Sequence, residues 1–455
     1  VTRSGAEASS TSASPSRVLV MCTCTAFGGS HLPDLTVVLA GEDGSGRRLG
    51  IVAARAHHAE IGGTQAGSMP PDARTLEDEG VAIAPRAAAR RGVLDESAVR
   101  AALSAARHPS RDPQLNVDDL RAMVAALEAG AAELRAQAAA IGADALAQAF
   151  SALISRSAAR TAAVARTVPE AGLAREDALD DGTPIRVRID RRAGGICIDF
   201  TGSGGVHPGN LNAPLAVTRS AVLYALRVLA GRLEPLDEHR APLNEGFLHG
   251  VELVVPEGIL NPPFAAEPAR CPAVFAGNTE TSQRVAEAVL GAFGVVAEGQ
   301  GTMNSVSIAG DGFAVYETLG GGAGASDAQD GTDAVHVHMT NTRLGDAEVL
   351  EASAPLRVMA LRVRPGSGGD GAHRGGNGME RAFEALAPCI ASMAAQRRVR
   401  APRGACGGGD GQPGRQQLER ADGTTVAIAG DGSAALSAGD VFRIETPGGG
   451  GFGAA

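Results

Sequence analysis

The most restrictive feature of this chain is the uneven distribution of its glycines. The sequence has 61 glycines in 455 residues, and most of them lie in the second half. From residue 300 to the C-terminal end, short apolar runs alternate with glycine-rich turns. Glycine at this density permits tight turns and close approach of one backbone to another. We therefore predict an unusual β-rich core in that half of the chain.

Residues 95–167 have a different character, because they are rich in Ala, Leu and Arg. Two series of apolar side chains recur there with helical spacing: Leu120, Met123, Val124, Leu127 and Leu134, and then Leu146, Phe150, Leu153 and Ile154. Asn116 is a plausible N-cap for the first helix, and Gly142 is expected to end it. Their polar faces carry Arg, Glu and Gln, so we expect a helical hairpin that packs on a sheet.

The remaining elements are predicted from periodicity. RLGIVAARAHH (48–58) is the clearest strand of the first part. Apolar and polar residues alternate on both sides of a turn at 191–195, which predicts a β-hairpin over 184–200. Helices are expected around 215–231 and 280–294. The fold class that follows is α+β, a mixed β-rich core with a helical hairpin and Gly-rich loops.

Composition narrows the class of protein. The net charge of −10 and the sequence pI of about 5.5 argue against a nucleic-acid-binding surface. The six cysteines have no C-x-x-C spacing and are interpreted as reduced thiols. No apolar run approaches 18 residues, and the N-terminal stretch lacks the apolar core of a signal peptide. We expect a soluble, cytoplasmic enzyme.

Two glycine-rich segments near the N-terminus concentrate metal-binding side chains. GGSHLPDLT (28–36) and RAHHAEIGG (55–63) contribute His31, Asp34, His57 and His58, in a chain with only ten histidines. Imidazole and carboxylate together suit a borderline divalent cation. A lone H-x-x-D pair is more often an ordinary polar pair, and the second histidine cluster favours the metal. Neighbours on a strand face opposite ways, so one of the paired histidines would be a ligand and the other a supporting or substrate contact.

Three further segments are candidates for substrate binding or catalysis. In HPGNLNAPL (207–215), Asn210 and Asn212 could bind a polar substrate or form an ordinary turn. GNTETSQR (277–284) opens a helix, where Asn278, Thr279 and Thr281 could form an anion site, or Asn278 or Thr279 a simple N-cap. HVHMTNTR (336–343) is expected to place His336 and His338 on one side of a strand, for hydrogen bonding or for support of catalysis.

The sequence lacks, or matches poorly, the usual motifs of nucleotide-binding sites and serine hydrolases. Without lysine no phosphate-binding loop of the G-x-x-x-x-G-K type is possible. GGGAGA (320–325) does not lie cleanly between a strand and a helix, so a dinucleotide site is poorly supported. The sequence has no G-x-S-x-G nucleophile elbow accompanied by a His and an Asp in a suitable order along the chain.

Taken together, these segments resemble the hydantoinase B/5-oxoprolinase family from about residue 18 onward. The motifs that carry the resemblance are GGSHLPDLTVV, RAHHAEIGGTQAGSMPPDA, LDDGTPIRVRI, DFTGSGGVHPGNLNAPLAVTRSAVLYALR, PLNEG, GNTETSQR, EGQGTMNS, YETLGGGAGA, HVHMTNTR, RPGSGGDGAHRGGNG and TPGGGGFG. The resemblance implies one half of a two-part, ATP-dependent system that acts on cyclic amides such as 5-oxoproline and hydantoins. The other half would be a hydantoinase A-like, actin-like ATPase that phosphorylates the amide carbonyl, so a hetero-oligomer is expected.

The resemblance also implies roles for individual residues. His31, Asp34 and His57 would bind a divalent metal (Zn, Mn or Fe), with His58 as the alternative ligand or a catalytic contact. His336 and His338 would shuttle protons or hold a carboxylate, and ATP would bind to the partner subunit. The stretch HVHMTNTRLGDAEVLE is closest to the 5-oxoprolinase branch.

The chain departs from the family pattern near its start. Members usually begin earlier, with an acidic segment that looks like a source of a further metal carboxylate, so an N-terminally truncated chain is expected. Thr23-Cys24-Thr25 replaces an Asn-Asp-Pro-like turn, and Glu60 replaces an aspartate. The alternatives are a subunit of an ATP-dependent ketone carboxylase and a truncated, inactive paralogue.

The expected organisation has three parts. Residues 1–17 form a disordered tail, and residues 18–175 form an N-terminal metal-site region with the helical hairpin. Residues 176–455 form the β-rich C-terminal region.

Overall fold

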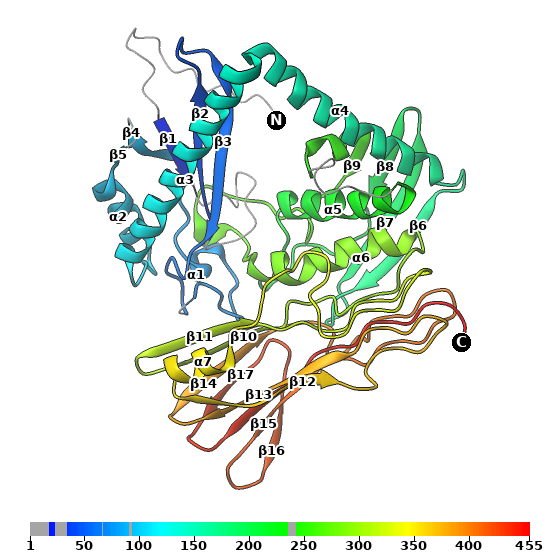
Figure 1. Ribbon diagram of the computed structural model, residues 1–455. Coiled ribbons are helices and arrows are strands. Elements are labelled where there is room, and N and C mark those ends of the chain that lie inside the picture. Colours follow the sequence, from blue (N-terminus) through cyan, green and yellow to red (C-terminus); the bar gives the residue numbers. More distant parts are fainter. Residues whose placement is uncertain (1–17, 23–33, 66, 91–92, 235–242) are drawn as a thin grey trace.

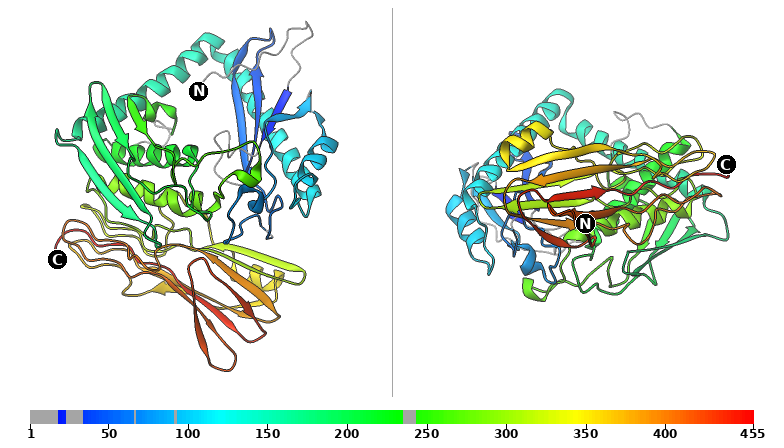
Figure 2. Two further views of the ribbon diagram at one scale, coloured as in Figure 1. Left: turned by 180° about the vertical axis from the view of Figure 1, so that it is seen from behind. Right: turned by 90° about the horizontal axis from the view of Figure 1, so that it is seen from below.

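The structure is a computed structural model that describes residues 18–22, 34–65, 67–90, 93–234 and 243–455. The expected tail at 1–17 and His31 lie outside the described residues. Figure 1 shows three layers: an N-terminal sheet with its helices at the upper left, a central layer of helices and a sheet beside it, and two C-terminal sheets below both. Figure 2 shows the same arrangement from behind. The α+β class expected from the sequence is confirmed.

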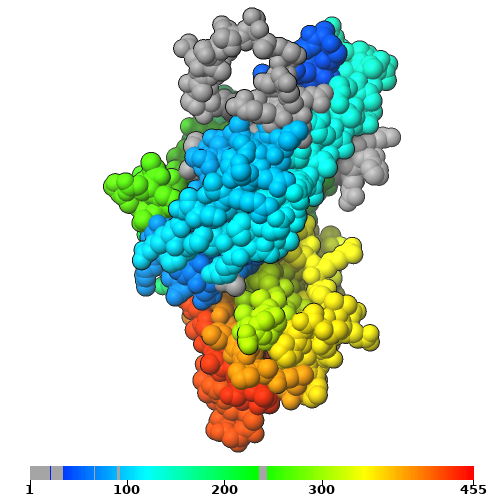
Figure 3. All heavy atoms as spheres, turned by 90° about the vertical axis from the view of Figure 1, so that its left-hand side faces the viewer, coloured from blue at the N-terminus to red at the C-terminus, as the bar shows by residue number. Residues whose placement is uncertain are grey.

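The N-terminal layer is a five-stranded sheet with strand order β3-β2-β1-β4-β5. Its strands are β1 (Val18–Cys22), β2 (Asp34–Glu42), β3 (Arg48–His57), β4 (Arg86–Arg90) and β5 (Val93–Leu94). Alternation along β2 turns Leu35, Val37 and Leu39 into the core. The long helix α3 (Pro113–Ile141) packs across β2 and β3 on that side, and Figure 3 shows its cyan atoms covering this flank of the molecule. The short helices α1 (Leu76–Glu79) and α2 (Glu96–Ser104) complete the layer.

The predicted helix break at Gly142 is confirmed. Helix α4 (Ala143–Thr167) follows directly, and the two helices are bent by 109° relative to each other. They form an open pair in which α3 covers the first sheet and α4 reaches the central layer (Figure 1). The expected N-cap at Asn116 is wrong: Asp112 caps α3 by accepting from the Leu115 N–H, and Asn116 is buried within the helix. Phe150, expected on the apolar face, is 41% exposed.

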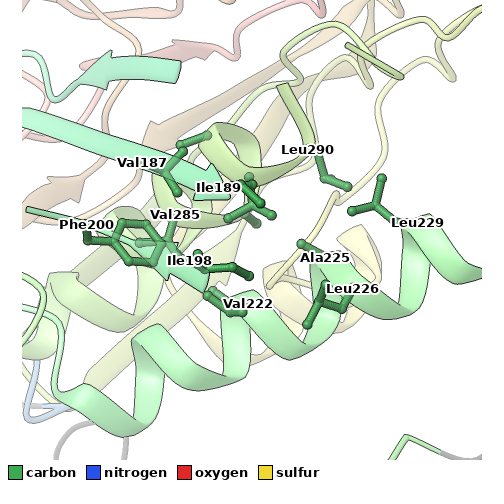
Figure 4. Close-up of a cluster of buried hydrophobic side chains, with 14 of the residues drawn as sticks. Val187, Ile189, Ile198, Phe200, Val222, Ala225, Leu226, Leu229, Val285 and Leu290 are labelled. Atoms are coloured by element: carbon green, nitrogen blue, oxygen red, sulfur yellow. The ribbon is translucent and has the colours of Figure 1, made fainter. Parts of the chain in front are cut away.

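The central layer contains the predicted hairpin. Strands β7 (Pro184–Arg192) and β8 (Gly195–Asp199) pair with Ile189 opposite Ile198, flanked by β6 (Leu173–Ala178) and β9 (Val251–Val254). Helix α6 (Ser282–Ala292) packs against β6 and β7 of this sheet, and helix α5 (Leu215–Leu233) packs against α6 and α4. Figure 4 shows the side chains of the hairpin and the two helices turned toward one another, Phe200 and Val222 among them. The helix predicted at 215–231 is confirmed.

The C-terminal layer consists of two antiparallel sheets of short strands, as predicted. Figure 2 shows these strands side by side from below. One sheet has the order β11-β10-β14-β17 and the other β12-β13-β18-β15-β16. Their bounds are β10 (Ser305–Gly310), β11 (Phe313–Thr318), β12 (Leu356–Arg364), β13 (Gly378–Ala385), β14 (Cys389–Ala394), β15 (Arg415–Glu419), β16 (Thr425–Ile428), β17 (Ser433–Leu436) and β18 (Val441–Glu445). Helix α7 (Ala347–Ser353) precedes β12, and three short helical turns, η1 (Glu245–Leu248), η2 (Pro268–Arg270) and η3 (Gly277–Thr281), lie in the central part of the chain.

Many C-terminal glycines lie in extended segments packed backbone against backbone. A Cβ placed on Gly375 would lie 1.9 Å from the Gly449 carbonyl oxygen, and one on Gly448 would lie 1.8 Å from that of Ser367. No side chain fits at these distances, so the glycine density reflects close packing, as expected. In the described part of the chain no single helix is both long and apolar enough to cross a bilayer. Cys197, Cys271, Cys389 and Cys406 are free thiols.

Candidate functional site

Asp34 and His57 form a cross-strand pair at one end of the N-terminal sheet. Asp34 begins β2, His57 ends β3, and the register places them directly opposite each other. Asp34 Oδ1 lies 3.3 Å from His57 Nδ1. The Asp34 side chain is 11% exposed and that of His57 is 43% exposed. The antiparallel register therefore joins two expected metal ligands that are 23 positions apart in the sequence.

The separation of these two atoms is compatible with shared coordination. Two ligands of one zinc-like ion, each about 2.1 Å from the metal, lie about 3.0 to 3.4 Å apart in octahedral or tetrahedral geometry. The observed distance of 3.3 Å falls within that range. Within the described ranges, no group of three or more His, Cys, Asp or Glu side chains could hold a metal. The third expected ligand, His31, lies outside the described residues.

His58 faces away from this pair, as alternation predicts, and is completely buried. Its Nδ1 lies 3.3 Å from Asp119 Oδ2 and 3.3 Å from Asn116 Nδ2, both on α3. Its Nε2 is buried and has no hydrogen-bond partner among the residues that the structure describes. Burial lowers the pKa of His58, although Asp119 opposes the shift. A proton on Nδ1 would bond to Asp119 and leave Nε2 with its lone pair, as in a carboxylate-supported metal ligand, whereas the Asn116 amide would donate to Nδ1 only in the opposite tautomer.

Glu60 holds the loop that follows β3 in place. Its carboxylate accepts from Ser110 Oγ at 2.6 Å and from the N–H groups of Gly62, Arg111 and Asp112. Burial would raise the pKa of Glu60, but these hydrogen bonds outweigh it and hold the pKa below its usual value. The carboxylate is therefore committed to holding the loop in place.

A pocket of about 390 Å³ opens beside His57, between this loop and the C-terminal sheet β11-β10-β14-β17. Its walls are mainly apolar, with Met69, Phe275, Val315 and Met393 among them. Polar groups lie at a few places, including Glu60, Gln65, Ser305 and Tyr316. A mainly apolar cavity with few polar groups is the usual form of a small-molecule site.

A smaller pocket of about 230 Å³ lies on the Asp34 side of the pair. It is lined by Asp34, Arg55, Ala216, Val217, Ser220, Asn278 and Met339. The structure therefore brings Asn278, an expected substrate contact, into the same pocket as the expected ligand Asp34.

The other expected substrate contacts hold this region together through backbone carbonyl groups. Asn212 Nδ2 donates to the carbonyls of His207, Gly209 and Ala273, and Asn210 Nδ2 donates to those of Pro70 and Pro71. Thr281 Oγ1 donates to the Leu211 carbonyl at 2.6 Å. These bonds join the loop at 207–213 to Pro70 and Pro71, to Ala273 and to Thr281. Their proposed contact with substrate stays a prediction.

The helix expected at 280–294 begins earlier than predicted, because GNTET (277–281) forms a π-helical turn that runs directly into α6. Asn278 and Thr279 lie inside this turn and do not cap the helix, so that expectation is wrong. Thr279 is 3% exposed, and its Oγ1 has no partner within the described residues. π-Helical turns are frequent at functional sites.

His336 and His338 do not lie on a strand, and the expected common face is wrong. Residues 338–339 form a turn in which His338 has φ of 53°. His336 Nδ1 lies 3.2 Å from Thr340 Oγ1, and its Nε2 lies 3.1 Å from Thr342 Oγ1. His338 is next to Tyr224, whose hydroxyl is 3.3 Å from Nδ1. Burial, then Arg284 and Arg397, lower the pKa of His338 to about 4, so its ring is neutral at pH 7.

Three residues of the site region have no counterpart among the sequence predictions: Arg55, Glu79 and Asp119. Arg55 could have been found, because it is two positions before His57 on the predicted strand and therefore shares its face. Asp119 and Glu79 reach the site through tertiary packing, for which the sequence alone contains no spacing signal.

Solved structures with a similar fold include the ATP-dependent caprolactamase from Pseudomonas jessenii. It matches with a TM-score of 0.83 and 22% identity, over 97% of this chain and 78% of the caprolactamase chain. A nucleotide-free acetone carboxylase matches with a TM-score of 0.78 and 17% identity, over 96% of this chain and 65% of the carboxylase chain. At these identities the likeness shows a common fold.

Sequence similarity is higher with 5-oxoprolinase 1 of Arabidopsis thaliana, at 37% identity over 94% of this chain and 34% of the plant protein. The chain spans about a third of the length of that relative. The family model for hydantoinase B/oxoprolinase matches residues 7–455. The resemblance inferred from the motifs is thus confirmed, and the chain belongs to the hydantoinase B/oxoprolinase family.

Proposed function

We propose that this chain supplies the metal-binding, hydrolytic half of an ATP-dependent enzyme that opens a cyclic amide such as 5-oxoproline or a hydantoin. The observation that carries the proposal is the Asp34–His57 pair, which lies between an apolar pocket and a polar one. The proposal is supported by the similarity to proteins named 5-oxoprolinase. ATP would be used by a hydantoinase A-like partner, as the family resemblance implies, and the absence of a lysine for a phosphate-binding loop in this sequence agrees with that division.

Asp34 and His57 would hold the divalent ion together with His31, and zinc, manganese and iron all accept this donor set. His58 is the alternative ligand, since its buried Nε2 is backed through Nδ1 by Asp119. Such an ion polarises a carbonyl group and lowers the pKa of bound water.

The chain's own residues would bind and orient the activated amide. The apolar wall formed by Met69, Phe275 and Met393 would surround the ring and exclude bulk water. The Asn278 amide would contact the polar end of the substrate from the opposite pocket. Thr279, Thr281, Asn210 and Asn212 would support that contact through the loop and turn that they hold. His336 and the neutral His338 would orient the substrate or relay a proton from the side of the pocket lined by Met339.

The proposal is tested with the chain produced together with its ATPase partner. We expect ATP-dependent turnover of 5-oxoproline or hydantoin, and a loss of about a hundredfold or more in Asp34→Asn, because a neutral amide is a much weaker metal ligand than a carboxylate. The matched control is Asp43→Asn in the exposed turn at the other end of the β2–β3 hairpin.

Turnover unchanged in Asp34→Asn would contradict the assigned role of this pair. A bicarbonate-dependent product from a ketone, with no reaction of 5-oxoproline, would instead favour the alternative of a ketone carboxylase.

A further inference from the structure

The polar pocket beside Asp34 has a basic residue positioned by the same strand register that forms the Asp34–His57 pair. Arg55 is two residues before His57 on β3, and its cross-strand partner Thr36 is two residues after Asp34 on β2. Side chains two positions apart share a face, so all four lie on one face of the hairpin. Arg55 Nε donates to Thr36 Oγ1 at 3.0 Å, which orients the guanidinium over this face.

Apart from the Asp34 carboxylate, which also lines this pocket, two of the other walls favour negative charge. Ala216 and Val217 belong to the first turn of the 19-residue helix α5, and Asn278 belongs to the π-helical turn that continues into α6. The first turn of a helix has a partial positive charge. Ser220 and Asn278 add a hydroxyl and an amide, both able to bond to oxygen. Arg55 thus lines the same cavity of about 230 Å³ as residues from two helix starts.

We infer that this pocket is an oxyanion-binding subsite, in which Arg55 binds a carboxylate or phosphoryl group of the reacting molecule. The guanidinium forms paired hydrogen bonds with either group. The identity of the anion rests on the proposed function: 5-oxoproline carries a carboxylate, and the activated amide carries a phosphoryl group. Among the described residues, none that lines the apolar pocket on the other side of the pair is an arginine, whereas Arg55 lines the smaller pocket and would contribute positive charge there.

Binding is measured first, without turnover, by calorimetric titration of the full chain with inorganic phosphate and separately with 5-oxoproline. We expect at least one of the two anions to bind, and Arg55→Gln to weaken that binding at least tenfold. Arg55→Lys retains the charge without the planar fork and should recover part of the affinity. The matched control is Arg48→Gln, which removes the same charge from the other end of β3, seven residues or about 23 Å away.

Turnover then identifies the anion. If Arg55 holds the carboxylate, Arg55→Gln raises KM for 5-oxoproline and leaves 2-pyrrolidinone, the same ring without a carboxylate, unaffected. If it holds the phosphoryl group, kcat falls for both substrates. Anion binding that depends on Arg55 in a chain without ring-opening activity would support the subsite and reject the proposed function. Equal binding in the wild-type chain and Arg55→Gln, or no binding of either anion, overturns the inference.

Discussion

Glu79 is completely buried at the end of α1, beneath the segment that leads into the π-helical turn. Its Oε1 accepts from the backbone N–H groups of Val274 and Phe275, each at 2.8 Å. Burial raises the pKa of Glu79 to about 8, against these two hydrogen bonds. The side chain is therefore mostly protonated at pH 7 and connects α1 to the wall of the apolar pocket, where Phe275 lies.

This protonation predicts a pH-dependent stability. The pKa of Glu79 is near 4.5 in the unfolded chain and about 8 in the folded one. Between pH 4.5 and pH 8 the folded state therefore binds one more proton than the unfolded state. Stability from this group is present at pH 4.5 and is lost as the pH rises toward 8. We expect Glu79→Gln to remove this loss, which is on the order of 4 kcal/mol between pH 5 and 8.5.

Urea unfolding of the wild-type chain, of Glu79→Gln and of the control Glu77→Gln on the same short helix measures the effect. A wild-type chain and Glu79→Gln whose stabilities change in parallel between pH 5 and 8.5 would show that Glu79 is ionised throughout.

At the residue scale, the sequence could predict which way neighbouring side chains on a strand face, but not which residues they contact. His57 and His58 were expected to face opposite ways, and alternation at the end of β3 places them so. The pairing of Asp34 with His57 depends on the β2–β3 register, which H-x-x-D spacing does not contain. The support of His58 by Asp119 depends on how α3 crosses the sheet, and no local pattern specifies that.

The π-helical turn at 277–281 packs directly on the loop at 207–213. A Cβ on Gly277 would lie 1.9 Å from the Asn212 carbonyl oxygen and 2.4 Å from its carbon. Thr281 and Asn212 bond across the same contact region, to the Leu211 and Ala273 carbonyls. The contact therefore has no space for a side chain at position 277.

We expect Gly277→Ala to destabilise the chain by about 3 kcal/mol or more, because backbone on both sides must move. Gly205→Ala is the control, since a Cβ there meets nothing within 4 Å. Thermal or urea unfolding of the two variants measures the difference, and equal stability would show that the turn and the loop are not in contact.

At the element scale, hydrophobic periodicity predicts a helix or strand correctly where one face of that element is buried. The 184–200 hairpin alternates between core and solvent, so its strands were predicted correctly. The strand predicted for HVHMTNTR is wrong, because these residues contain a turn in which His338 adopts positive φ. His336 and His338 each have a polar partner of their own, Thr340 and Tyr224. The π-helical turn has no apolar periodicity, since it consists of one glycine and four polar residues, and all of them except Asn278 are buried.

The central and C-terminal layers are joined by a buried network of charges. Arg397, which follows β14, lies 3.1 Å from Asp177 on β6, 2.7 Å from Glu287 on α6 and 2.9 Å from Glu298. Arg284 also pairs with Glu287. Burial alone would raise the pKa of Glu298, but Arg397 and Arg403 outweigh it and lower the pKa to about 2. The network is therefore ionised at Glu298 and depends on its arginines.

Arg397→Met should destabilise the whole molecule by about 3 to 5 kcal/mol, because it leaves buried carboxylates without their shared cation. Arg357→Met is the control, since its pair with Glu384 is at the surface with the arginine 57% exposed, where such pairs contribute about 0 to 1 kcal/mol. Denaturant unfolding of both variants provides the comparison. If Arg397→Met lowers the free energy of unfolding no more than Arg357→Met does, this network does not hold the layers together.

At the scale of the whole molecule, the α+β class and the glycine-rich β region could be predicted, and the arrangement of the layers could not. The three hydrophobic clusters draw on segments far apart in the sequence; Cys271 and Val274, for example, pack with the N-terminal sheet. The layers meet through Arg397 and its partners, whose positions in the sequence show no common spacing.

The central claim is that Asp34 and His57 bind one divalent ion. The most direct test is metal content by mass spectrometry of the purified chain after exposure to zinc, manganese or iron, in the wild type, Asp34→Asn, His57→Ala and His58→Ala. We predict about one equivalent in the wild type and a loss of most of it in Asp34→Asn and His57→Ala. If both of those variants retain a full equivalent of metal, the pair does not bind the ion and the account is contradicted. If His58→Ala loses the metal while His57→Ala retains it, the ligand is His58 rather than His57.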